Sequence, residues 1–317
     1  MRVLVTGAAG MLGRKLTDRL AERGEIGGRQ ITYLELADVV GSPSAAHGMI
    51  SHVVDLSEPG VSDDLVAGGV DVVFHLAGVV SGEAEADFDK GMRVNLDGTR
   101  NLFDSLRQAP GTPRVVFTSS IAVFGAPFPD PIPDDFHCTP LTSYGMEKLV
   151  GEALLADYSR RGLFDGIGVR LPTISVRPGA PNAAASGFFS GIIREPLNGQ
   201  RAVLPVGRDV RHHHASPRTA IDFLLHAAAL DTTALGARRN LTMPGISVTV
   251  GEQIDALERV AGAAAVALID EVPDPVIGEI VAGWPRRFST PRAESLGFIA
   301  ETSYDQIIQA YIEDDLE

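Results

Sequence analysis

The sequence predicts an α/β fold, a Rossmann-type doubly wound parallel sheet with a smaller C-terminal lobe. Three observations predict it. Short apolar runs alternate with longer amphipathic stretches through the first half of the chain. Most runs are apolar at successive positions, as in strands that helices cover on both faces. A glycine-rich segment directly follows the first run and opens the first amphipathic stretch, as at the strand-to-helix turn of doubly wound sheets.

The first half of the chain contains six short apolar runs and three longer amphipathic stretches. We expect strands at residues 3–6, 31–36, 52–55, 70–76, 114–120 and 167–171. Helices are expected between them, at 12–23, 92–107 and 144–161. Repetition of strand and helix in this way indicates a parallel sheet.

The regular alternation of strands and helices ends after residue 175, where prolines and glycines separate short elements. A strand at 210–214 and a helix at 219–230 resume the alternation, and a further helix is expected at 250–261. We therefore expect a first domain at 1–175, to which 209–235 returns. Residues 176–208 and 236–317 would form the second lobe.

Composition excludes several classes of protein. Apolar residues make up 44% of the 317 residues, so a large core can form. The chain has 27 basic and 41 acidic residues, which gives a net charge of −14. Such a chain is a poor candidate for binding nucleic acid or an anionic membrane. A single cysteine, Cys138, excludes an internal disulfide and a multi-cysteine zinc site. With no visible targeting segment or apolar run of about 20 residues, we expect a cytoplasmic protein.

The glycine-rich segment predicts a dinucleotide site. Its spacing is G-x-x-G-x-x-G, and the residues assigned to the cofactor are Gly7, Gly10, Met11, Leu12 and Gly13. Glycine lets the backbone turn tightly and approach a pyrophosphate, and the N-terminus of the following helix offers free N–H groups. The position of the segment, between an apolar strand and an amphipathic helix, favours this interpretation over a turn selected only for packing.

An acidic residue that binds the cofactor ribose is expected about 20 residues further on, at the end of the second strand. Glu35 lies 22 residues after Gly13, and Asp38 is the competing candidate. A carboxylate there accepts both ribose hydroxyls and repels the extra phosphate of NADP. The sequence therefore favours NAD.

Two later strand ends extend the predicted cofactor site. Asp55 and Leu56 follow the third strand, where the carboxylate could meet the adenine amino group or merely cap a turn. The small residues Ala77 and Gly78, after Leu76, end the fourth strand and leave room for a flat ligand near the backbone.

A proton-transfer set follows the fifth strand. Tyr144 and Lys148 are four residues apart and share one face of a predicted helix. Ser119 and Ser120 end the fifth strand, at the edge where such sheets bind ligands. A tyrosine with a pKa near 10 must lose about three units to act as a base at neutral pH. A positive charge about 4 Å away supplies roughly that.

These segments, together and in order, resemble the extended short-chain dehydrogenase/reductase superfamily. The resemblance implies that Tyr144 is the general base, that Lys148 holds the ribose and lowers the tyrosine pKa, and that Ser120 binds the reacting oxygen. Alignment of residues 123–125 favours Ser120 over Ser119. Asn95 would join a proton relay or hold a water at a helix bend, and the protein would be a homodimer. The remaining assigned cofactor contacts are Asn95, Thr118, Ser119, Tyr144, Lys148, Pro172, Thr173 and Ile174.

Within that superfamily the chain is similar to the D-erythronate dehydrogenase family. The stretches that carry the likeness are residues 79–82, 170–179, 183–189 and 212–218. The resemblance implies a place in carbohydrate metabolism, with NAD-dependent oxidation of the C2 hydroxyl of a four-carbon sugar acid, D-erythronate, to 2-oxo-erythronate. Residues 1–175 would then bind NAD, and the second lobe would bind the substrate.

An acidic substrate needs a local basic site in a chain of net charge −14, because distant charges are screened within about 8 Å at physiological salt. Arg177 and Arg211 are both candidates for a bidentate clamp on the carboxylate. Ser81, Ser175 and Asn182 are candidates for the sugar hydroxyls, beside Ser120 and Tyr144. No metal site is expected at His212–His214, since neighbours in a strand point to opposite faces; a packed or substrate-contacting histidine is favoured.

Three alternatives remain open. A nucleotide-sugar 4-epimerase uses the same tyrosine, lysine and serine. Dehydratases of the superfamily carry acidic residues directly after the threonine of the fifth strand. Here Thr118 is followed by two serines, which argues against a dehydratase. L-threonine 3-dehydrogenase is a near neighbour in the superfamily. A non-catalytic NAD-sensing regulator is a more distant alternative, because a sensor does not need Ser120, Tyr144 and Lys148 together.

Overall fold

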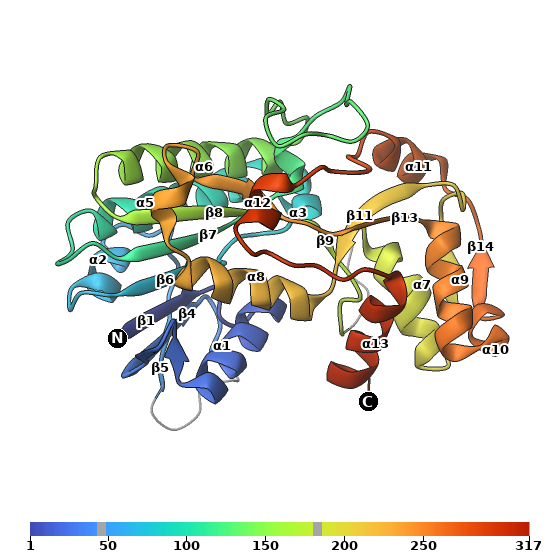
Figure 1. Ribbon diagram of the computed structural model, residues 1–317, viewed down its shortest axis with the longest axis horizontal. Coiled ribbons are helices and arrows are strands. Elements are labelled where there is room, and N and C mark those ends of the chain that lie inside the picture. Colours follow the sequence, from blue (N-terminus) through green and yellow to red (C-terminus); the bar gives the residue numbers. More distant parts are fainter. Residues whose placement is uncertain (43–48, 180–185, 317) are drawn as a thin grey trace. The chain divides into compact units, whose positions relative to one another are not determined.

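The structure is a computed structural model that describes residues 1–42, 49–179 and 186–316 (Figure 1). Contacts divide the chain into two compact units. Unit 1 comprises residues 1–123, 142–170 and 221–241, and unit 2 comprises 124–141, 171–220 and 242–317.

Unit 1 is built on a seven-stranded sheet with the order β12-β8-β7-β6-β1-β4-β5. The pairs β1–β4, β1–β6, β4–β5 and β6–β7 are parallel. The chain runs outward from β1 in both directions, which confirms the predicted Rossmann-type topology. The strands are β1 (Arg2–Thr6), β4 (Tyr33–Asp38), β5 (Met49–Val53), β6 (Val72–His75), β7 (Arg114–Ser120), β8 (Asp165–Leu171) and β12 (Asn240–Thr242).

Helices flank this sheet (Figure 1). They are α1 (Met11–Arg23), α2 (Val61–Val66), α3 (Ser81–Ala86), α4 (Phe88–Gly91), α5 (Gly98–Leu106), α6 (Ser143–Arg160) and α8 (Pro217–Ala229). A core of aliphatic and aromatic side chains, with Phe103, Phe117 and Phe164 fully or almost fully buried, packs β6 and β7 against α5 and α6. The predicted helix at 92–107 is interrupted, because residues Met92–Asp97 form a π-helical turn, η1, before α5.

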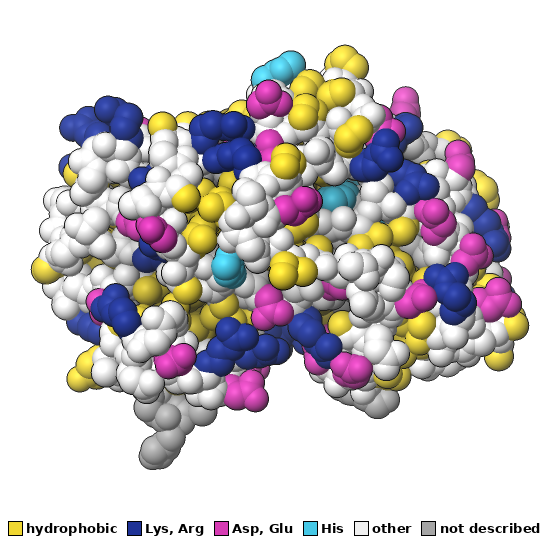
Figure 2. Space-filling model, viewed as in Figure 1, with side chains coloured by type: hydrophobic (Ala, Val, Ile, Leu, Met, Phe, Trp, Pro, Cys, Tyr) yellow, Lys and Arg dark blue, Asp and Glu magenta, His cyan; other side chains and the backbone are white. Residues whose placement is uncertain are grey.

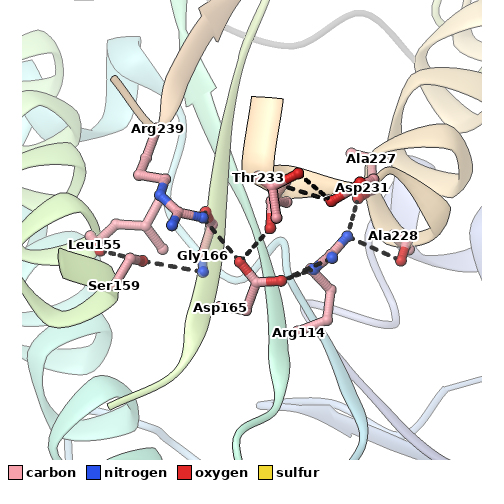
Figure 3. Close-up of polar contacts among 11 residues, drawn as sticks. Arg114, Leu155, Ser159, Asp165, Gly166, Ala227, Ala228, Asp231, Thr233 and Arg239 are labelled. Carbon is pink, nitrogen blue, oxygen red and sulfur yellow. Dashed lines mark hydrogen bonds and ion pairs between the residues drawn. The ribbon is translucent and has the colours of Figure 1, made fainter. Parts of the chain in front are cut away.

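The returning segment 221–241 is tied to unit 1 by a polar cluster around Asp165 (Figure 3). Both Nε and NH2 of Arg114 donate to Oδ2 of Asp165, at 3.0 and 2.7 Å, and NH1 donates to the carbonyls of Ala227 and Ala228 at the end of α8. Arg239 donates to the other carboxylate oxygen at 2.8 Å. A cation at the C-terminal end of a helix also stabilises the helix dipole. The cluster therefore fixes α8 beside β7 and β8.

Unit 2 contains the three-stranded sheet β13-β11-β9 and the parallel pair β10–β14. Its core packs Phe189, Ile192 and Ile193 of α7 against apolar residues of α9 and α13. The strands are β9 (Thr173–Ile174), β10 (Ala202–Leu204), β11 (Arg211–Ala215), β13 (Ile246–Thr249) and β14 (Ile269–Glu271). The helices are α7 (Gly187–Leu197), α9 (Val250–Ala261), α10 (Ala263–Val266), α11 (Pro275–Ala282), α12 (Pro291–Ser295) and α13 (Tyr304–Asp314).

Three short elements complete the described chain: the hairpin β2 (Glu25–Ile26) and β3 (Arg29–Gln30), and two 3₁₀ turns, η2 (Ile121–Val123) and η3 (Thr232–Leu235). The boundaries of the two units differ from those expected from the sequence. Residues 124–141 group with unit 2, and the segment that returns to unit 1 begins at 221. Which unit holds the substrate stays a prediction.

Basic and acidic side chains are interspersed over the face shown in Figure 2, without a large block of one sign. Within residues 1–42, 49–179 and 186–316, no helix is long and apolar enough to span a bilayer.

Candidate active site

The glycine-rich turn between β1 and α1 is shaped by close backbone contacts. Gly7 has φ +71°, and a Cβ there would lie 2.6 Å from the backbone nitrogen of Ala77. A Cβ at Gly13 would overlap the carbonyl oxygen of Gly7. Gly10 is exposed and caps α1. The turn therefore leaves the N-terminal N–H groups of α1, at Met11 and Leu12, uncovered by side chains of the loop, which fits a pyrophosphate.

The acid beside this turn is Asp38, and the assignment of Glu35 to the ribose is wrong. Glu35 lies in the middle of β4 and is 8% exposed. Arg2 donates to its Oε1 at 2.6 Å, and Nε2 of His52 lies 3.2 Å from its Oε2. Asp38 ends the strand, and its Oδ2 accepts the N–H of Ala9 in the glycine turn at 2.9 Å. Asp38 therefore has the place expected of a ribose-binding carboxylate.

The next two strand ends are partly accessible. Oδ1 of Asp55 accepts the backbone N–H and the hydroxyl of Ser57, and Oδ2 accepts from Arg93 at 3.1 Å. These bonds lower the pKa of Asp55, against the effect of its burial. Asp55 thus caps its turn, and its contact with adenine stays a prediction, as does that of the buried Leu56. At the end of β6, Leu76 and Ala77 are partly exposed and Gly78 is exposed.

The two serines at the end of β7 have different partners. The Ser119 hydroxyl donates to Oε1 of Glu152 at 2.6 Å, and Arg170 forms a two-bond ion pair with the same carboxylate. The Ser120 hydroxyl instead lies close to Tyr144 and lowers the tyrosine pKa. The structure therefore favours Ser120 over Ser119 for the proton-transfer set, and the role of Ser120 in the reaction stays a prediction. The assignment of the Ser119 side chain to the cofactor is wrong, because that side chain is 2% exposed and bound to Glu152.

Lys148 completes the set on α6. It is 4% exposed, and its Nζ lies 5.7 Å from the centre of the Tyr144 ring and 5.1 Å from that of Phe117. Burial lowers the pKa of Lys148 to about 8, with Glu147 acting in the opposite direction. Burial raises the pKa of Tyr144 to about 12, and Glu147 adds to that rise. In the protein alone, Tyr144 therefore does not have the low pKa that the sequence led us to expect.

Asn95 lies in the π-helical turn η1 and is 2% exposed. Its amide nitrogen donates to Oε2 of Glu147 at 2.6 Å and to the carbonyl of Val79 at 3.2 Å, and its Oδ1 accepts the N–H of Val79 at 2.8 Å. Its backbone carbonyl accepts from Thr99. The side chain thus fixes the backbone after β6, and its predicted relay role and cofactor contact stay predictions.

Glu147 was missed by the sequence analysis. It is fully buried, beside Lys148 in sequence and bonded to Asn95. A glutamate in an amphipathic helix is normally solvent-exposed, so only its place between Tyr144 and Lys148 could have drawn attention to it.

Two further residues of unit 1 were assigned to ligands, Thr118 to the cofactor and Ser81 to the substrate. Thr118 is buried and its hydroxyl donates to the carbonyl of His75, so this side chain joins β7 to β6 rather than facing a ligand. Ser81 begins α3 and is partly exposed, so it remains available to a ligand.

In unit 2, Ser175 is fully buried, and its Oγ lies 3.0 Å from Nδ1 of His214 and 3.5 Å from the Tyr304 hydroxyl. Its assignment to a sugar hydroxyl is therefore wrong. Pro172 is buried, and Thr173 and Ile174 form β9, where the Thr173 hydroxyl lies 2.6 Å from Nε2 of His212. Their contact with the cofactor stays a prediction.

The histidines of β11 alternate in direction, as expected for a strand. The rings of His212 and His214 pack on Phe189, whereas that of His213 packs on Phe288. Burial lowers the pKa of His212 to about 3 and that of His213 to about 4, and it holds the pKa of His214 well below its usual range. They are neutral, packed side chains.

Arg177 and Arg211, the two candidates for binding the substrate carboxylate, differ in the partners of their guanidinium groups. Arg211 donates to the carbonyl of Ser247 at 2.7 Å and pairs with Glu252 at 3.1 Å. The guanidinium of Arg177 bonds the Ser186 hydroxyl at 2.9 Å, and no acidic side chain among the described residues pairs with it. Burial and the nearby Arg194 lower the pKa of Arg177. Arg177 thus has the unmatched charge that a carboxylate ligand would satisfy. Asn182 lies outside the described residues.

Comparison with known proteins identifies the family of the chain. The profile of the NAD dependent epimerase/dehydratase family matches residues 3–231. The chain is 46% identical over 319 residues to D-erythronate dehydrogenase of Cupriavidus necator, across 99% of this chain and 98% of that protein. It is 39% identical over 318 residues to D-erythronate dehydrogenase of Haemophilus influenzae, across 100% of both.

A crystal structure described as a nucleoside-diphosphate-sugar epimerase from Agrobacterium tumefaciens is also similar. It is 58% identical, with a TM-score of 0.96, and the match covers 100% of this chain and 94% of that one. Since the family profile spans more than half of the chain and both dehydrogenases match it along their whole length, the chain belongs to the NAD dependent epimerase/dehydratase family, as an NAD-dependent short-chain oxidoreductase that acts on a CH–OH group.

Proposed function

We propose that the protein catalyses NAD-dependent oxidation of the C2 hydroxyl of D-erythronate to 2-oxo-erythronate. Two full-length relatives that carry the name D-erythronate dehydrogenase support this substrate. The observation that carries the chemistry is the closeness of the Ser120 hydroxyl to Tyr144, whose pKa it lowers, beside the buried Lys148, whose Nζ lies 5.7 Å from the centre of the Tyr144 ring. This arrangement supports a hydroxyl donor and a proton acceptor that act on a single substrate oxygen.

Each side chain has a defined task. NAD, when bound, supplies the acceptor for the electron pair that leaves C2. The Ser120 oxygen accepts the N–H of Ala122 at 3.1 Å, which leaves its proton to be donated to the substrate oxygen. The Tyr144 oxygen takes the proton of the substrate hydroxyl. The ammonium group of Lys148 stabilises the tyrosinate by its charge.

Arg177 is the group that we assign to the substrate carboxylate. The Arg177 guanidinium is partly withdrawn from water and, among the described residues, bonds a serine hydroxyl and no carboxylate, so it would gain most from a bidentate carboxylate. Ser81 would bind a substrate hydroxyl. We further propose a cytoplasmic homodimer, formed through the helices at 92–107 and 144–161.

A nucleotide-sugar 4-epimerase is the second candidate, because the similar Agrobacterium structure is described as a nucleoside-diphosphate-sugar epimerase. Such an enzyme would regenerate its NAD in each cycle and release no NADH. The unmatched charge of Arg177 is the observation that favours a small acid.

The test is NADH formation by the purified protein with D-erythronate, L-threonate, L-threonine and UDP-glucose, each with NAD and with NADP. We expect NAD reduction with D-erythronate and little with the other compounds. Conversion of UDP-glucose without net NADH would establish the epimerase. Tight NAD binding without turnover of any compound would instead favour a regulator.

A further inference from the structure

Glu147 is a buried carboxylate inside the proton-transfer set, and the chemistry described so far does not use it. It is 0% exposed. Oε2 accepts the Asn95 amide at 2.6 Å, while Oε1 has no hydrogen-bond partner within the described part of the chain. A buried carboxylate with an unpaired oxygen is costly, so a compensating role is expected.

The helices around it are shaped to admit this carboxylate. A Cβ at Gly91, the last residue of α4, would lie 2.5 Å from Oε1, and the same Cβ would lie 3.0 Å from Ala84 of α3. Glycine and alanine thus leave just enough space for the glutamate between α6 and these two helices. An apolar residue would avoid the desolvation cost, yet the site holds a charge.

Asn95 lies between Glu147 and Lys148: its amide nitrogen donates to Oε2 of Glu147, and a Cβ at Gly78 would lie 2.7 Å from its Oδ1 and 3.6 Å from Nζ of Lys148. In agreement with this closeness, Glu147 raises the pKa of Lys148, against the lowering caused by burial, and also raises that of Tyr144. No described acidic side chain forms an ion pair with Lys148. His75 of β6, the other titratable group near Lys148, is neutral because burial lowers its pKa to about 3.

The other charged groups on the elements packed against α6 are at least partly exposed, so water screens them more strongly. They are Glu83 and Glu85 of α3, Asp89 and Lys90 of α4, Asp87 between them, Arg93 and Asp97 of η1, Arg100 and Asp104 of α5, and Arg114 of β7. Glu147 is therefore the buried charge nearest to Lys148 in sequence.

We propose that Glu147 is a positioning residue of the oxidation: its buried carboxylate orients Asn95 and offsets the positive charge of Lys148, so that the ammonium group persists beside Tyr144 at working pH. The proposal rests on the roles of Tyr144 and Lys148 and not on the identity of the substrate. Through Asn95, the same carboxylate holds the Val79 backbone that follows β6.

The chain makes a direct test possible, because it has only three lysines, Lys15, Lys90 and Lys148. Protein labelled with [13Cε]lysine is titrated by NMR without cofactor or substrate, and the Lys148 signal is identified by its loss in Lys148→Met. In Glu147→Gln, which keeps an acceptor for Asn95, the Lys148 midpoint should fall by about one pH unit, the size expected for loss of one nearby charge.

Glu152→Gln is the matched control. Glu152 is also buried on α6 but pairs with Arg170, so its variant should be destabilised while the Lys148 midpoint stays unchanged. If Glu147→Gln does not fold, Glu147→Met removes the charge with an unbranched apolar side chain and should give the same downward shift. The alkaline limb of kcat/KM should move down with the NMR midpoint.

An unchanged or higher Lys148 midpoint in a folded Glu147 variant would overturn the proposal and leave Glu147 a structural partner of Asn95. This result is independent of turnover, so it remains distinguishable from failure of the proposed substrate.

Discussion

The Ser119 hydroxyl donates a 2.6 Å hydrogen bond to Oε1 of Glu152, whereas the hydroxyl of the next residue, Ser120, acts on Tyr144 and lowers its pKa. Two adjacent serines at one strand end thus have separate partners. Ser119 binds a buried carboxylate of α6 that also pairs with Arg170, and Ser120 is the serine that we propose for the reaction.

The serine pair gives the first prediction. Ser120→Ala should lower kcat by about 100-fold, the usual cost of losing one donor to a reacting oxygen. Ser119→Ala should leave kcat within a few fold but reduce the free energy of unfolding by about 1–3 kcal/mol, because Glu152 loses a buried donor. Steady-state kinetics and denaturant unfolding of both variants check this. Equal loss of kcat in the two would contradict the assignment.

Variants of Asp38 and Glu35 distinguish which of the two carboxylates binds the ribose of NAD. Asp38→Asn should raise the dissociation constant of NAD by about tenfold and weaken discrimination against NADP, because a charge is lost where ribose is expected to bind. Glu35→Gln should leave NAD binding nearly unchanged and affect stability, since its carboxylate pairs with Arg2. Calorimetric titration with NAD and NADP distinguishes them. Weaker NAD binding by the Glu35 variant alone would restore the original assignment.

Arg177 should control affinity for the acid. Arg177→Met is expected to raise KM for D-erythronate by about 10- to 100-fold, in line with about 1.5–3 kcal/mol for a charge-assisted bond. Arg211→Met should change KM by less than about threefold, because Arg211 already bonds Ser247 and Glu252. The reverse order of effects would move the carboxylate site to Arg211.

The buried histidines predict sensitivity to acid. His75, His212, His213 and His214 all have folded-state pKa values far below 6.5, because burial disfavours the imidazolium. As pH falls below about 6.5, the unfolded chain gains protons that the folded chain does not, so stability is lost. Each histidine adds a slope of about 1.4 kcal/mol per pH unit.

Denaturant unfolding between pH 7 and pH 5 measures that slope. His75→Gln should reduce that slope by about one proton, because the buried ring stays neutral in the folded chain. A stability that is flat over this range would contradict the neutral, packed state of these rings.

The sequence predicted six of the seven strands in the sheet of unit 1, the glycine turn and the shared helix of Tyr144 and Lys148, because each depends on local pattern and spacing. The short edge strand β12 was not predicted. Prediction from the sequence failed where long-range contacts decide. β4 ends at Asp38 rather than near Glu35, because its pairing extends to Ala37 opposite Thr6 of β1 and to Asp38 opposite Val53 of β5. Ser175 was expected to meet a ligand, yet His214 and Tyr304 enclose it. The bond between Asn95 and Glu147 spans 52 residues and leaves no local signal.

The most direct test of the proposed reaction is transfer of the C2 hydrogen. D-erythronate carrying deuterium at C2 is incubated with NAD and the purified protein, and the NADH and the organic product are examined by mass spectrometry. We expect singly deuterated NADH and an equal amount of 2-oxo-erythronate without deuterium. Unlabelled NADH, or deuterium retained in the product, would show that oxidation occurs at another carbon and would contradict the proposed function.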